Sequence, residues 1–148
     1  MIDRRSLLAA TFLAATLCVL PSAAQDTTRL NPNSATESEL AAVEGLSPEL
    51  AAAILAQRPF ETMVEFSELV SASVATDAAS ALYEQLFIPI NLNSASAEEI
   101  ALIPGMSRRM VREFLEYRPY ADIDVFNREI GKYVDEAEVA RLRSYLTL

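Results

Sequence analysis

The order of hydrophobic and polar residues along the chain predicts helices. Apolar residues recur three or four positions apart, as at Leu40 and Val43 or at Leu50 and Ile54, so they fall on one face of a helix. No stretch alternates apolar and polar residues for long enough to form a strand. The sequence therefore predicts an all-α protein of short helices joined by tight turns.

The same pattern occurs twice, sixty positions apart. Residues 31–60 align with residues 91–120 without a gap, Phe66 and Phe126 keep the register, and the two copies then diverge. The residues of the first stretch that meet the same residue type in the second include Asn31, Asn33, Ser34, Ala35, Glu39, Gly45, Ser47, Leu55, Arg58 and Pro59. We interpret this as an internal duplication with a unit of about sixty residues.

Start and stop signals divide each copy into four predicted helices. A capping box, in which a hydroxyl and a glutamate satisfy free backbone N–H groups, begins the first helix, and a glycine ends it. A serine caps the second helix, which ends before a proline. These residues are Thr36, Glu39, Gly45, Ser47 and Pro59 in the first copy, and Ser96, Glu99, Gly105, Ser107 and Pro119 in the second. The third and fourth helices are expected at about 62–70 and 77–87, and at about 122–130 and 135–146.

Residues 1–24 have the pattern of a secretory signal peptide. A basic start with Arg4-Arg5 precedes an apolar stretch, 6–20, and a small-residue exit. Because this stretch is shorter than the roughly 20 residues that a spanning helix needs, we expect cleavage after about Ala24 and a periplasmic or secreted protein. The double arginine also fits the twin-arginine route. Membrane contact is expected only if the segment is retained as an anchor.

The residue types disfavour catalytic and metal chemistry. The chain contains no histidine, and its one cysteine, Cys18, lies in the predicted signal peptide. The usual zinc ligands and the Ser-His and Cys-His nucleophile pairs are therefore missing from the mature chain. We expect a protein that is not an enzyme, with no catalytic residues, no metal, no cofactor and no small-molecule substrate.

Charge is distributed unevenly between the two copies. The chain has a net charge of −9, and loss of one acidic and two basic residues with the signal peptide makes it −10. Residues 25–88 have a net charge of −8, whereas residues 89–148 have a net charge of −2. Because an acidic field repels nucleic acid at long range, the second copy is the better candidate for binding an anionic partner.

The order hydrophobic, x, glycine, hydrophobic, small residue between two short helices resembles the helix-hairpin-helix motif. The lead-in INLNSASAEEIALIPGMS, residues 90–107, is similar to the domain of the competence protein ComEA and its relatives. The resemblance covers nearly all of the mature chain and implies two tandem helix-hairpin-helix domains, 25–88 and 89–148. It also implies weak binding of double-stranded DNA without sequence preference, in which hairpin N–H groups and a helix N-terminus meet a phosphate.

The resemblance assigns the phosphate-binding hairpin to the second copy. The matching residues are Gly105, Met106, Ser107, Arg108 and Arg109, with Arg112 one turn further on. The first hairpin, Gly45, Leu46 and Ser47, is followed by Glu49, which complements the helix dipole itself and would repel a phosphate. We therefore expect the first hairpin to be structural. The family's second glycine is serine in both copies, and its hydroxyl can cap N–H groups that a phosphate would use.

Other interpretations of these residues stay open. Arg109 with Glu113 and Arg112 with Glu116 are four apart and fit ordinary intrahelical ion pairs. Arg58 and Arg118 fit a structural role, in an ion pair or at the last carbonyls of their helices. The chain also fits a scaffold that binds an envelope protein, as in an extrinsic photosystem II subunit of similar fold. Core positions are expected for Tyr117, Tyr120, Tyr133 and Tyr145.

Overall fold

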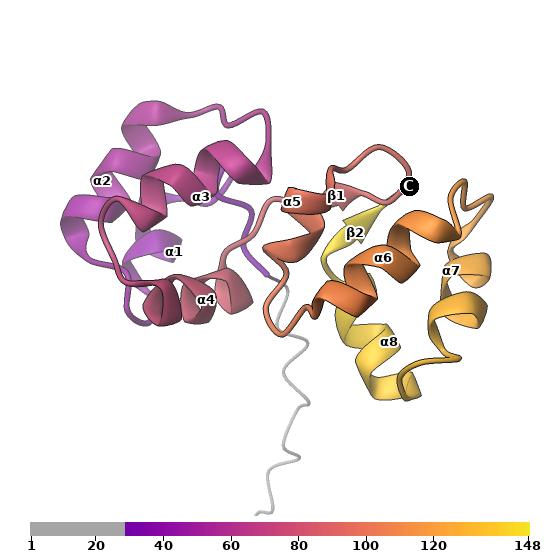
Figure 1. Cartoon of the computed structure of the whole chain (residues 1–148). Helices are drawn as coiled ribbons and strands as arrows, with labels where there is room; N and C mark the ends of the chain where they lie inside the picture. The colour runs from indigo at the N-terminus through magenta and orange to yellow at the C-terminus, as the bar shows by residue number, and fades with distance from the viewer. Residues whose placement is uncertain (1–28) are drawn as a thin grey trace, which may run out of the picture.

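The computed structural model describes residues 29–148, so the predicted signal peptide with Cys18 lies outside the described residues. The described chain is mostly helical, which confirms the predicted all-α character (Figure 1). The first repeat contains α1 (Glu37–Ala41), α2 (Pro48–Gln57), α3 (Met63–Ser71) and α4 (Thr76–Gln85). The second contains β1 (Ile90–Asn91), α5 (Ala97–Ala101), α6 (Arg108–Glu116), α7 (Ile123–Ile130), α8 (Glu136–Arg143) and β2 (Leu146–Thr147). None of these helices combines the length and hydropathy required to cross a lipid bilayer.

Local capping explains why the helices begin where the sequence predicts. In α1, the backbone N–H of Glu39 donates to the Thr36 hydroxyl, and the Thr36 N–H donates to the Glu39 carboxylate. The same capping box begins α5. At the fourth helices the copies differ, because Asp135 caps α8 whereas Ala75 gives α4 no side-chain cap. The predicted helices are thus confirmed, with ends that shift by at most about three residues.

A short parallel strand pair is the feature that the hydrophobic pattern did not predict. Ile90 of β1 pairs with Leu146 of β2, and Leu30 forms the equivalent parallel bridge with Leu86. Two residues are too few to show an alternation of apolar and polar positions. Each pairing joins the start of a repeat to the residue beyond its fourth helix. The sixty-residue register therefore extends through the whole repeat, although the sequence similarity fades after Phe66.

The residues that both repeats share connect distant parts of one repeat. The side-chain amide of Asn33 donates to the Phe60 carbonyl (2.9 Å), and its oxygen accepts from the Phe60 N–H (2.8 Å). Asn93 makes the same two bonds to Tyr120, at 2.9 and 2.8 Å. The Asn-x-Asn-Ser stretch is therefore held against the aromatic residue that follows each Arg-Pro pair. This is a structural reason for keeping both motifs in both copies.

The two arginines before these prolines are half-buried, and of the two only Arg58 forms a hydrogen bond among the described residues. Nη2 of Arg58 donates to the Ala35 carbonyl at 2.7 Å. Ala35 precedes α1, so the acceptor is not at the end of the helix that Arg58 follows. Nε and Nη2 of Arg118 are buried and have no hydrogen-bond partner among the described residues. Burial lowers the pKa of Arg118. The structural role expected for Arg58 is confirmed, but its acceptor differs from the expected helix-end carbonyl.

One hydrophobic core runs through both repeats. Phe87 from the connection between them meets the Tyr145 ring edge-on, with centroids 4.9 Å apart. Tyr120 and Tyr145 are buried, as predicted, with 2% and 1% of their surface exposed. Tyr117 is half-buried and packs against the core, so its expected placement is confirmed in part. Tyr133 is also half-buried and is not a core residue.

Candidate functional site

The second hairpin joins α5 to α6 and turns at Gly105. This glycine is exposed and has a φ of 76°, a conformation that glycine adopts without steric cost. Met106 points back toward the core, and its N–H donates to the Ile103 carbonyl at 3.0 Å. The Ser107 hydroxyl accepts from the Met110 N–H at 3.1 Å and so occupies one of the free N–H groups of α6. The expected capping role of this serine is confirmed.

Three arginines follow the turn on α6, and all three are exposed. They are Arg108, Arg109 and Arg112. The first turn of α6 contains no acidic residue, so nothing within it neutralises the first two. Arg109 contacts Glu113 at 3.7 Å, which confirms one of the two expected intrahelical pairs. Arg112 and Glu116 form no ion pair within residues 29–148.

The first hairpin has the same backbone but a carboxylate at its helix start. Gly45 has a φ of 82°, Leu46 packs against the core, and the Ser47 hydroxyl accepts from the Leu50 N–H at 3.2 Å. Glu49 lies in the first turn of α2. A hydrogen bond with its own backbone N–H, and a second with Ser47, lower the pKa of Glu49. The Glu49 carboxylate thus already lies at the N-terminal end of α2, where an anion would otherwise bind.

The Gln85 side chain forms hydrogen bonds to the backbone of the first hairpin, and the second hairpin lacks the residues for equivalent bonds. Its side-chain oxygen accepts from the Glu44 N–H and its amide nitrogen donates to the Glu44 carbonyl, both at 3.1 Å. Sixty positions later, Pro104 stands in place of Glu44 and has no N–H to donate. Tyr145, buried in the core, stands in place of Gln85. The two hairpins therefore differ in backbone access as well as in charge.

Arg141 of α8 is a neighbour of the second hairpin that the sequence analysis missed. Its Nη2 lies 3.5 Å from the position that a Cβ on Gly105 would occupy. Its guanidinium pairs with Glu138 through two bonds of 2.7 Å, and it also lies 5.7 Å from the Tyr145 ring centroid. Arg141 is thus a further cation beside the arginines of the second hairpin, but it is already paired with Glu138. No local signal around Gly105 could reveal this contact across the repeat.

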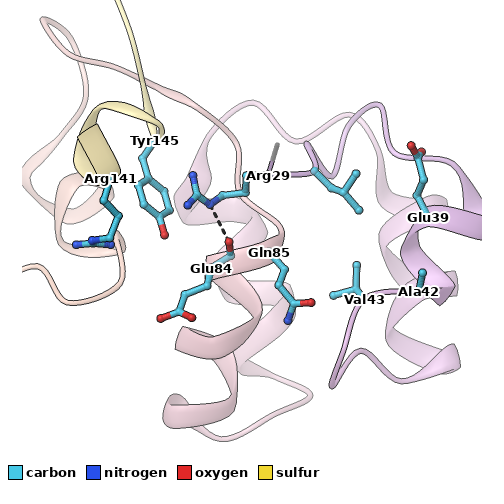
Figure 2. A pocket seen from close by; sticks show the side chains of 9 residues that line it. Arg29, Glu39, Ala42, Val43, Glu84, Gln85, Arg141 and Tyr145 are labelled. Atoms are coloured by element: carbon cyan, nitrogen blue, oxygen red, sulfur yellow. Dashed lines mark hydrogen bonds between the residues drawn. The ribbon is translucent and has the colours of Figure 1, made fainter. Parts of the chain in front are cut away.

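A cavity of about 620 Å³ lies between the repeats, next to Arg141 (Figure 2). Arg29 and Tyr145 form one wall, and Ala42 and Val43, which follow α1, form the opposite one. Its polar groups are largely engaged elsewhere. The engaged groups are Glu39 with Thr36, Gln85 with Glu44, Arg141 with Glu138, and Arg29 with the Glu84 and Ser144 carbonyls. The cavity therefore offers few free groups to orient a small molecule.

The fold and the site define a mostly helical protein with an internal repeat, in which one of two equivalent hairpins is basic and exposed. Comparison of the chain with protein-family models, with curated proteins and with solved structures finds no match. The functional interpretation consequently rests on the geometry and charge of the two hairpins.

Proposed function

We propose that the protein is an exported, non-enzymatic binding protein with two tandem helix-hairpin-helix domains, residues 25–88 and 89–148, similar to ComEA. In this proposal the second domain binds duplex DNA outside the cytoplasm without reading its sequence. A phosphate lies against the hairpin Gly105–Arg109, and Arg112 assists from the next turn of α6.

The difference between the two hairpins carries this proposal. Both have a glycine with positive φ and a serine cap, so the backbone could meet an anion in either copy. In the first copy Glu49 and the Gln85 side chain occupy that region. In the second copy Arg108 and Arg109 stand at the positive end of α6, where like charge slightly destabilises a helix. A bound phosphate removes this cost.

The chemistry of such a site predicts weak and sequence-independent binding. Backbone N–H groups and arginines contact phosphate, which is the same at every base pair. Each contact releases counterions, so affinity falls as salt rises. Few contacts and a net charge of −10 on the mature chain predict a Kd of about 1 μM or weaker at physiological salt.

The charge of the first repeat favours a second candidate function, which is a scaffold that binds an envelope protein. Residues 25–88 carry a net charge of −8, which opposes DNA but suits a basic protein partner. In this alternative, the arginines of α6 serve ion pairs such as Arg109 with Glu113. The two functions differ in what happens when the charge of the second hairpin is reversed.

A titration of a fluorescent duplex with the purified protein, followed by anisotropy at low and at physiological salt, tests the proposal. Arg108→Glu should weaken binding by about tenfold or more and lower the slope of log K against log salt by about 1. Arg143→Glu is the matched control, because Arg143 is exposed on α8 and its reversal changes the net charge equally.

The outcomes separate the candidates. A selective loss in Arg108→Glu supports a phosphate site at the second hairpin. Equal losses in both variants indicate attraction by overall charge alone and contradict the assigned site. If the unaltered protein binds no duplex even at low salt, DNA binding is refuted, and a basic protein partner becomes the function to pursue.

A further inference from the structure

Two tyrosines lie side by side next to the second hairpin. Tyr117 follows the last residue of α6, and Tyr133 lies in the turn between α7 and α8. Their hydroxyl oxygens are 2.8 Å apart, within hydrogen-bond distance, and their ring centroids are 6.4 Å apart. This hydrogen bond, with Glu113 nearby, raises the pKa of Tyr133. Tyr133 therefore stays neutral at physiological pH, and its contact with the Tyr117 hydroxyl connects the end of α6 to the turn after α7.

Each ring carries a cation that comes from the other element. The guanidinium carbon of Arg109, on α6, lies 5.3 Å from the centroid of Tyr133. Nζ of Lys132, in the turn, lies 5.2 Å from the centroid of Tyr117. Both distances fall within the range in which an aromatic ring attracts a cation. The contacts are reciprocal, so the tyrosine pair restrains both cations at once.

The carboxylates that pair with these cations are covered, while the cations project into solvent. Arg109 is 70% exposed and its partner Glu113 only 14%. Lys132 is 52% exposed and its partner Glu129 only 14%. A partner that approaches from solvent therefore meets the positive groups first. Because the rings and the carboxylates already restrain these long side chains, binding through them orders little additional side-chain freedom.

The first repeat lacks the whole arrangement. Gln57 and Ser73 stand where the second repeat has the two tyrosines. Glu49 stands in place of Arg109, and Ala72 in place of Lys132. The tyrosine pair and its cations are thus confined to the repeat with the exposed basic hairpin.

We propose that Tyr117 and Tyr133 are positioning residues that hold Arg109 and Lys132 as a pair of cations, and that this pair binds the phosphate backbone of duplex DNA beside the hairpin. The inference rests on the proposed DNA binding of the second repeat. It extends the contact surface from the start of α6 to the turn after α7. It also explains why two aromatic residues occur at half-exposed positions, where packing alone does not require them.

The test compares two pairs of substitutions by the same duplex titration over a range of salt concentrations. Tyr117→Leu/Tyr133→Leu removes the ring electrostatics at similar size, whereas Tyr117→Phe/Tyr133→Phe keeps both rings and loses only the hydroxyls. We expect the leucine pair to bind about three- to tenfold more weakly, with a shallower salt slope. The phenylalanine pair should keep the salt slope of the unaltered protein. Thermal unfolding of each variant checks that the fold is intact.

A second comparison keeps the proposal decidable if the leucine pair does not fold. Arg109→Gln/Lys132→Gln changes only exposed head groups and should lower the salt slope by about 2. In a folded leucine background, the same two changes should add little, because the cations are no longer held in place. Duplex binding by the leucine pair with unaltered affinity and slope overturns the inference, as does an unaltered slope in the glutamine pair. If the unaltered protein does not bind duplex at all, the proposed function fails and takes this inference with it.

Discussion

The guanidinium carbon of Arg29 lies 3.3 Å from the centroid of the Tyr145 ring, and this contact joins the two repeats. Nε of Arg29 also donates to the Glu84 carbonyl at 2.9 Å, as Figure 2 shows. Nη1 donates to the carbonyl and the hydroxyl of Ser144, at 3.2 and 2.9 Å. Because Arg29 precedes α1 and Tyr145 follows α8, one side chain attaches the start of the first repeat to the end of the second.

Removal of this side chain should destabilise the protein. Arg29→Ala loses a stacked cation and hydrogen bonds to two carbonyls, so we expect the free energy of unfolding to fall by about 1–3 kcal/mol. Arg29→Lys should recover only part of it, because an ammonium lacks the planar fork. Urea unfolding measures both variants. Arg143→Ala, an exposed arginine on α8, is the control, and an equal effect there would contradict the assigned role.

Asn93, which lies just after β1, should contribute as much to the free energy of unfolding as a core residue does. Asn93→Ala removes two part-buried hydrogen bonds and leaves the backbone N–H and carbonyl of Tyr120 without these partners. We expect a loss of about 2–3 kcal/mol in the free energy of unfolding. Ser94→Ala, at the exposed neighbour, should change it by no more than about 0.5 kcal/mol. Similar losses in the two variants would show that the paired bonds contribute nothing.

Glycine at the second turn should be required for its backbone conformation rather than for space. A Cβ on Gly105 would meet only the end of the Arg141 side chain, at 3.5 Å, but the φ of 76° is costly for other residues. Gly105→Ala should therefore lower the free energy of unfolding by about 1–2 kcal/mol. Gly105→Asn should cost less, because asparagine tolerates this region. A thermal melt that ranks asparagine below alanine would refute the explanation.

Alkaline pH should weaken the second repeat through Tyr120. Burial raises the pKa of this tyrosine from 10.0 to about 12, and its hydroxyl donates to the Phe114 carbonyl. A raised pKa in the folded state means that the stability contribution is complete below pH 10 and is lost as the pH rises from 10 to 12. Thermal midpoints across this window should fall less steeply for Tyr120→Phe, which is the residue type at the matching position, Phe60. Identical pH profiles would exclude Tyr120 as the titrating group.

Helix positions could be predicted from the sequence because a cap acts within three residues. Thr36, Ser47 and Ser107 each accept a hydrogen bond from an N–H three positions later, so the signal and its effect lie together. The strand pairs could not be predicted, because Ile90 and Leu146 lie at opposite ends of a repeat and each strand has two residues. Long-range pairing of such short segments follows from packing, not from a local pattern.

The candidate hairpin was predictable in outline and not in its surroundings. The glycine and serine spacing predicted the turn and the cap made by Ser107. The orientation of Arg109 depends on Tyr133, which lies in the part of the repeats where the sequences no longer align. The contact between Gln85 and Glu44 could not be predicted either, because these two residues are 41 positions apart.

Each repeat begins and ends at the same place, since Leu30 pairs with Leu86 and Ile90 pairs with Leu146. Only Phe87, Ile88 and Pro89 separate the last pairing residue of the first repeat from the first of the second. A unit whose ends meet can be copied head to tail by a simple gene duplication, because the new copy needs no long linker to reach its starting position. The parallel strand pairs thus leave one copy free to keep the scaffold while the other acquires arginines and tyrosines.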